Sequence, residues 1–121
     1  MLTHIGLMLA LAGLSAGDEC KDDHWRPVIE ETEHLIEQRA PVVVPPEGFL
    51  GQPVPACVRL TFKVDSRGLP IDIVVDKSSK VYPLDMGALR ALKGYRFNSS
   101  NRQTVVHALV FALDRQGVHS P

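Results

Sequence analysis

The sequence predicts a two-layer α+β domain, in which a small antiparallel sheet of about three strands packs against one or two helices. Apolar and polar residues alternate from Cys57 to Asp65 and again from Ile71 to Asp76, which is typical of strands with one buried face. A segment from about Asp85 to Gly94 carries apolar residues at helical spacing. Neither kind of element can bury its apolar side alone, so we expect the helix to cover the strands.

The two strands are expected to form an antiparallel hairpin. Ser66 to Gly68 supply the turn, because Gly68 can take the positive φ angle that such a turn needs. We expect one core beneath the helix, made of Leu60, Phe62, Ile73, Leu89 and Phe97. The alternation places Arg59, Asp72 and Asp76 on the opposite face, where they are expected to meet water.

The segments around the second helix follow from turn and cap signals. Ser78 to Pro83 is expected to be a loop, Asp85 the N-cap and Gly94 the end of the helix. Tyr95 and Phe97 follow as core anchors. Thr104 to Leu113 is expected to form a last strand that is apolar on both faces apart from His107. Residues 114–121 show no pattern and are expected to be a loose tail.

The N-terminal part has a different character. Residues 1–17 resemble a signal peptide, because a short apolar run leads into small residues, and the alternative is a buried N-terminal helix. The run is short for a membrane span, so export is favoured over an uncleaved membrane anchor. Residues 18–43 form an N-terminal segment with a helix from about Pro27 to Arg39. A proline-rich connector follows.

Cys20 and Cys57 are the two cysteines of the chain. In an exported protein an even number of cysteines favours a disulfide over a metal site, so we expect these two to pair. The alternative is two buried free thiols.

Charge and motifs exclude several classes of function. Thirteen basic and fourteen acidic residues give a net charge of −1, which disfavours nucleic acid as a partner. His24 and His34 lie among acidic residues without a zinc-site spacing, and His107 is expected to be structural. The serines lack a nucleophile-elbow context, and no glycine-rich phosphate loop follows a strand. We therefore expect neither an enzyme nor a cofactor.

Three stretches in order resemble the C-terminal domain of TonB, the periplasmic energy transducer of Gram-negative bacteria. They are Val58-Arg59-Leu60-Thr61-Phe62-Lys63-Val64-Asp65 with Gly68, Ser78-Ser79 followed by Leu84-Asp85 and Ala88-Leu89, and Gly94-Tyr95-Arg96-Phe97. The resemblance covers residues 44–113. It implies a TonB-like fold that binds a peptide segment of an outer-membrane receptor or an inner-membrane transport complex in TonB-dependent transport, without transmitting force by itself.

The expected mode of binding is strand addition, in which a peptide pairs its backbone with a free sheet edge. As the last strand, Thr104 to Phe111 is the expected partner-binding edge, made of Thr104, Val105, Val106, His107, Ala108, Leu109, Val110 and Phe111. The same strand could instead pack in a homodimer or under the first helix. The alternative function is a periplasmic adaptor, inhibitor or enzyme subunit unrelated to transport.

Overall fold

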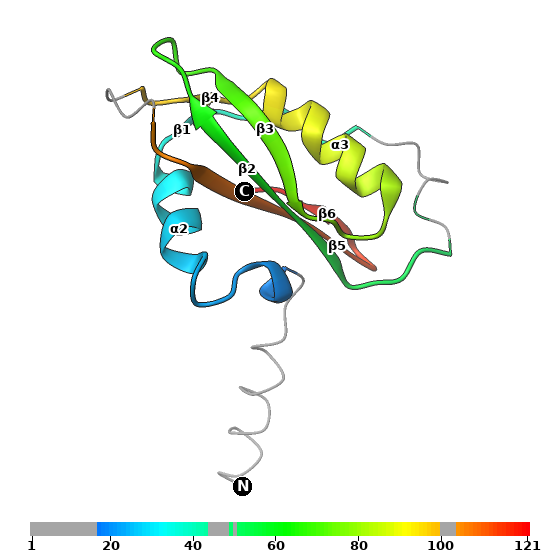
Figure 1. Ribbon diagram of the computed structural model, residues 1–121. Coiled ribbons are helices and arrows are strands. Elements are labelled where there is room, and N and C mark those ends of the chain that lie inside the picture. Colours follow the sequence, from blue (N-terminus) through cyan, green and yellow to red (C-terminus); the bar gives the residue numbers. More distant parts are fainter. Residues whose placement is uncertain (1–16, 44–48, 50, 100–103) are drawn as a thin grey trace, which may run out of the picture.

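The computed structural model describes residues 17–43, 49, 51–99 and 104–121, and the expected signal segment lies outside them except for Gly17. In chain order the elements are η1 (Asp18–Cys20), α2 (Arg26–His34), β1 (Ile36–Gln38), β2 (Ala56–Val64), β3 (Pro70–Lys77), α3 (Tyr82–Lys93), β4 (Arg96–Phe97), β5 (His107–Asp114) and β6 (Gly117–His119). Within these residues β3, β2, β5 and β6 form one antiparallel sheet in that order, and β1 pairs with β4 (Figure 1). The α+β class is confirmed, with more strands than expected.

The predicted hairpin is confirmed as β2 and β3. The carboxylate of Asp65 accepts hydrogen bonds from the N–H groups of Arg67 (2.8 Å) and Leu69 (3.0 Å), which fold the chain back. Both bonds lower the pKa of Asp65 below its ordinary value, and the bond from Leu69 has the larger effect. Gly68 has φ +83°, and a Cβ there would collide with the carbonyl oxygen of Phe97. Only glycine fits this turn without strain.

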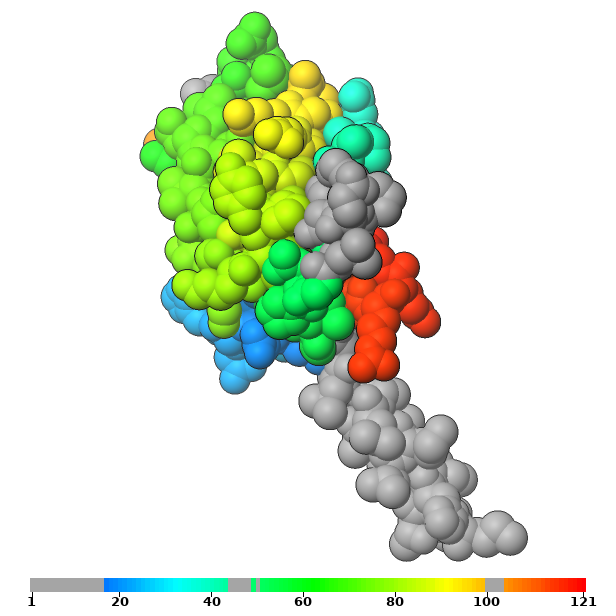
Figure 2. All heavy atoms as spheres, turned by 90° about the vertical axis from the view of Figure 1, so that its right-hand side faces the viewer, coloured from blue at the N-terminus to red at the C-terminus, as the bar shows by residue number. Residues whose placement is uncertain are grey.

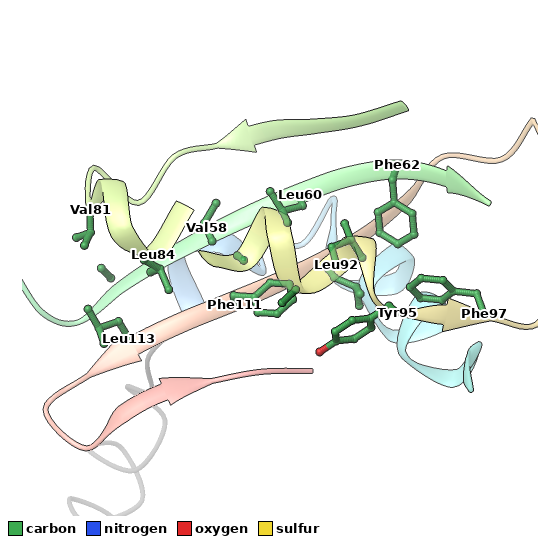
Figure 3. Packing of buried hydrophobic residues seen from close by; sticks show 14 of the residues in the cluster. Val58, Leu60, Phe62, Val81, Leu84, Leu92, Tyr95, Phe97, Phe111 and Leu113 are labelled. Atoms are coloured by element: carbon green, nitrogen blue, oxygen red, sulfur yellow. The ribbon is translucent and has the colours of Figure 1, made fainter. Parts of the chain in front are cut away.

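The main core lies between α3 and one face of the sheet, as expected. Leu60, Phe62 and Phe97 are buried there, and Ile73 and Leu89 pack at its margin. Figure 3 shows the aromatic rings of this core converging from β2, β4 and β5. The buried members are Ala56, Val58, Leu60, Phe62, Val64, Val81, Leu84, Ala88, Ala91, Leu92, Tyr95, Phe97, Leu109, Phe111 and Leu113.

The other face of the sheet is covered too, which corrects the expectation that it meets water. Ile29 of α2 packs on the small residues Ala108, Val110 and Ala112 of β5, together with the Cys20 and Cys57 side chains. Thus α2 and α3 lie on opposite faces of the sheet (Figure 1). The arrangement has three layers rather than the two expected, because the N-terminal segment adds its own.

The first helix is shorter than expected. It ends at His34, and the next residues form β1, with Ile36 opposite Phe97 of β4. The N–H of Asn98 donates to the carbonyl of Leu35 (2.8 Å). Pairing with β4 lets Leu35 and Ile36 pack against the main core. Tertiary packing therefore overrides the helical pattern expected to run to Arg39.

The second helix begins earlier than expected, at Tyr82 after an N-cap at Val81. Pro83 therefore lies in the first helical turn, where its missing N–H is tolerated, and not in a loop. Asp85 is not the N-cap. Its carboxylate instead accepts hydrogen bonds from the hydroxyls of Ser78 and Ser79 (2.5 Å each) and from the Ser79 N–H (3.0 Å). These bonds fix the loop that leads into the helix.

The last residues are ordered by contacts that replace the expected loose tail. Asp114 belongs to β5, and Gly117–His119 pair with β5 as β6. A hydrogen bond from the N–H of Gln116 is the main cause that lowers the pKa of Asp114. His119, whose Nε2 lies 2.7 Å from the Asp114 carboxylate, lowers it further. The hydroxyl of the buried Tyr95 donates to the carbonyl of Pro121 (3.2 Å). Burial raises the pKa of the Tyr95 hydroxyl.

Candidate functional site

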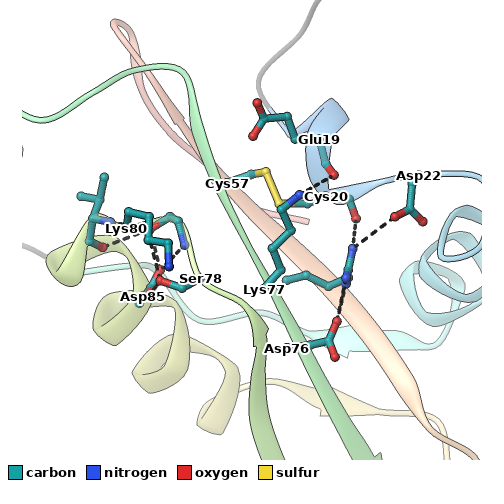
Figure 4. Close-up of a disulfide and its surroundings, with 12 residues drawn as sticks. Glu19, Cys20, Asp22, Cys57, Asp76, Lys77, Ser78, Lys80 and Asp85 are labelled. Carbon is teal, nitrogen blue, oxygen red and sulfur yellow. Dashed lines mark hydrogen bonds and ion pairs between the residues drawn. A yellow bond between two sulfur atoms is a disulfide. The ribbon is translucent and has the colours of Figure 1, made fainter.

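The predicted disulfide is confirmed. The sulfur atoms of Cys20 and Cys57 are 2.05 Å apart, and the bond joins η1 to β2 (Figure 4). Both cysteines are buried, with relative exposures of 0% and 5%. A cross-link over this sequence separation of 37 residues stabilises a fold by about 4 kcal/mol in the chain-entropy account. The bond therefore anchors the N-terminal layer to the sheet.

Arg59 lies beside this disulfide and is buried, contrary to the expectation that it faces water. Its guanidinium donates to Asp76 (2.8 Å from Nε) and to the carbonyl of Cys20 (3.1 Å), and a second Asp76 contact measures 2.7 Å. It also lies over the Trp25 ring, 4.7 Å from the centroid, and 3.9 Å from Asp22. The group therefore ties β2, β3 and the N-terminal layer together, and its charge is neutralised within the fold.

The histidines singled out in the sequence are dispersed over the fold. His24 and His34 are exposed, whereas His107 is buried at the start of β5 with its ring 5.8 Å from that of Phe62. Across the described part of the chain, no group of three or more His, Cys, Asp or Glu side chains could hold a metal ion.

The expected partner-binding strand, β5, lies between β2 and β6 in the sheet order, but β6 pairs only with residues beyond Phe111. Residues His107 to Leu113 pair with β2 on one side, and Ala112 to Asp114 pair with β6 on the other. Thr104 to Val106 precede the strand and are exposed. The last strand of the sheet is therefore β6 and not β5, but among the described residues no strand pairs with the side of residues 107–111 that faces away from β2. Partner binding by Thr104 to Phe111 stays a prediction.

Helix α2 also occupies part of this side of β5. The N–H of Ala108 donates to the hydroxyl of Thr32 (3.2 Å), and that hydroxyl donates to the carbonyl of Val28 (2.7 Å). Thr32 is fully buried. A peptide could pair with this stretch of β5 only after α2 moved away.

The bond between Ala108 and Thr32 also fixes which backbone groups of the sheet point outward. Since the Ala108 N–H points away from β2, Ala108 and its partner Thr61 are not a hydrogen-bonded pair. The N–H and C=O of Thr61 therefore face β3, where the partner of Thr61 is Val74. It follows that the Val74 N–H faces β2 and that the Val75 N–H faces away from the sheet.

Two observations agree with this assignment. Asp65, four residues after Thr61 on β2, donates its N–H to the carbonyl of Leu69 on the β3 side (2.9 Å). Pro70 lies opposite Val64, where the assignment makes the β3 nitrogen face outward. Proline has no N–H to donate and is found in sheets at such edge positions.

Strand β3 is therefore an open edge of the main sheet. It is eight residues long and runs along the border of the molecule in the space-filling view (Figure 2), and of the strands in the described ranges only β2 pairs with it. Ile71 and Val74 are 39% and 56% exposed. The register is interrupted twice, and Asp72 has φ +54°. Such irregularities are common on edge strands, where they limit unwanted pairing.

A groove of about 330 Å³ lies at the end of β3. It is lined by Glu19, Pro53, Pro55, Ala56, Cys57, Lys77, Ser78, Ser79 and Lys80. The ammonium group of Lys77 donates to the backbone carbonyl of Glu19 (3.2 Å) (Figure 4). A smaller hollow of about 110 Å³ lies between α2 and the C-terminal residues, lined by Lys21, Glu33, Val110, Ala112, His119, Ser120 and Pro121. Its volume is below the usual range for small-molecule sites.

No protein-family model, curated protein or solved structure matches this chain. Among the described residues, no helix is long and apolar enough to cross a membrane.

The sequence contains signals for an edge strand at β3 that our expectation did not use. Pro70 at the start of β3 and the aspartates at 72 and 76 are typical of an edge strand. The last strand, by contrast, is apolar on both faces, which is typical of a strand inside a sheet.

Proposed function

We propose that this chain is an exported, non-enzymatic protein-interaction domain that binds an extended peptide as an added strand on β3. The observation that carries the proposal is the open edge of β3, with outward backbone groups and the exposed side chains of Ile71 and Val74. In strand addition, backbone hydrogen bonds supply affinity and alternate side chains supply selectivity.

The disulfide and the signal-like N-terminus support the proposed compartment. Disulfides persist in oxidising compartments such as the periplasm and are rare in the cytosol. The bond between Cys20 and Cys57 supports an exported protein. Together with the resemblance to the TonB C-terminal domain, this favours the periplasm, and a partner that is a peptide segment of an outer-membrane receptor or a transport complex.

Two matched proline variants test the proposal. Val75→Pro removes an N–H that faces outward, so the protein should keep the pairing of β3 with β2 and lose peptide binding. Because the Val75 side chain packs against the main core, the variant should also lose some stability. Val74→Pro removes an N–H that faces β2, so it should lose stability. Folding is measured by circular dichroism with urea titration, and binding by titration with peptides selected from a random library displayed on phage.

The controls separate this site from the edge expected first. Val106 lies before β5, so Val106→Pro should leave peptide binding to β3 unchanged. A folded Val75→Pro variant that binds the selected peptides as the wild type does would exclude β3 as the binding edge. Loss of binding in Val106→Pro alone would return the site to residues 104–111.

A further inference from the structure

Strand β3 leads directly into the groove. Lys77 is the last residue of β3 and also lines the groove, and Ser78 to Lys80 continue its wall. A peptide paired along β3 would therefore place one of its ends at the mouth of the groove. We propose that the groove holds the carboxylate of an aspartate or glutamate at that end of the peptide, an inference that rests on the proposed strand addition.

The charges around the groove favour an acidic side chain. Lys77 and Lys80 both line it, and among the described residues of the lining Glu19 is the acidic one. Lys77 contacts the backbone carbonyl of Glu19 and has two more N–H donors on its ammonium group. In Figure 4 the Glu19 carboxylate points away from Lys77. The groove therefore offers two cations to an incoming carboxylate.

Neighbouring carboxylates are already held by other partners. Asp85 accepts hydrogen bonds from Ser78 and Ser79, and Asp76 is paired with Arg59. Because Asp85 takes up the serine hydroxyls, the groove would recognise its ligand through the lysine ammonium groups. The pairing of Asp76 and Asp85 also leaves less negative charge to oppose an acidic ligand.

The local backbone fixes where Lys80 is presented. Lys80 has φ +66°, and its N–H donates to the Ser78 hydroxyl (3.0 Å). The next N–H, of Val81, donates to the Ser79 hydroxyl (3.0 Å). Pro53 and Pro55 form an apolar wall of the groove. Pro53, Pro55 and Lys80 are all exposed, so an ion pair formed here would be in contact with water.

The experiment selects peptides from a random library displayed on phage, with the oxidised full chain as bait. The wild type should enrich peptides that alternate apolar residues and carry Asp or Glu at one end. The variant Lys80→Asn keeps a residue that tolerates positive φ and removes the charge. With Lys80→Asn, and more so with Lys77→Gln added, the apolar alternation should persist and the acidic preference should disappear.

Titration of one selected peptide measures how much its acidic residue contributes to the affinity. Replacing its acidic residue by the amide should weaken binding to the wild type by about two- to fivefold, the range of exposed ion pairs. The same replacement should have no effect on Lys80→Asn with Lys77→Gln. Lys93→Glu, an exposed change at the far end of α3, is the matched control and should keep the acidic preference.

The outcomes separate this proposal from strand addition itself. An acidic preference that survives in the double lysine variant, or peptides without any acidic preference, would overturn the proposal for the groove while leaving binding to β3 intact. Binding that is insensitive to Val75→Pro would instead overturn the proposed function.

Discussion

Removing the guanidinium of Arg59 should destabilise the protein more than removing that of an exposed arginine. Arg59 is 8% exposed and joins Asp76, the Cys20 carbonyl and the Trp25 ring. The variant Arg59→Ala loses all three contacts at once. It also leaves the Cys20 carbonyl without this donor.

The size of the effect follows from these contacts. A hydrogen bond to a charged group contributes about 1.5–3 kcal/mol, and a desolvated cation–π contact contributes about 1–2 kcal/mol. The Asp76 side chain is 34% exposed, so water can solvate it after the change, and the full penalty of an unpaired buried charge is not reached. We expect Arg59→Ala to lower the free energy of unfolding by about 3 kcal/mol.

Arg67→Ala is the matched control, because the Arg67 side chain is 77% exposed and only 3.8 Å from Asp65. We expect it to change the free energy of unfolding by about 0.5 kcal/mol or less. Both variants are unfolded in urea at pH 7 with the disulfide intact and followed by circular dichroism. Equal losses in the two variants would refute the view that Arg59 anchors the N-terminal layer.

Two further predictions concern the hairpin turn. Gly68→Ala should lower the free energy of unfolding by about 2 kcal/mol or more, because a Cβ at φ +83° collides with the Phe97 carbonyl, and a urea titration measures this. A neutral effect would show that the turn differs from the one described. Since the N–H groups of Leu69 and Arg67 lower the pKa of Asp65 from 3.8, its carboxylate stabilises the folded state above about pH 4, and this contribution is lost as the pH falls through the folded-state pKa. Asp65→Asn should therefore destabilise the protein at pH 7 much more than at pH 2, and an equal effect at both would contradict this.

The local features of the sequence predicted local structure well. The alternation from Cys57 to Val75 gave the hairpin, and Gly68 gave its turn. The prediction that Tyr95 and Phe97 are core anchors is confirmed, since both are buried, and such large aromatic side chains have much apolar area to bury. The even cysteine count gave the disulfide.

Long-range pairings were the part that the sequence could not supply. Ile36 continues an amphipathic helical pattern, and only its pairing with Phe97, about sixty positions along the chain, makes it a strand. Alternation places Arg59 on the face opposite the main core, but it does not show that the N-terminal segment returns to cover that face. The order of the strands in the sheet could not be predicted for the same reason, because it depends on which distant segments of the chain pair.

Amide hydrogen exchange, resolved by NMR in the free protein and with a selected peptide bound, shows which sheet edge binds the peptide. If the peptide adds to β3, the Val74 amide is protected by β2 in the free protein, where the Val75 amide exchanges rapidly. The bound peptide then protects Val75. The Ala108 amide should be protected in both states by Thr32. A Val75 amide that is already protected in the free protein, or peptide-induced protection in residues 104–111 instead of β3, would contradict the account.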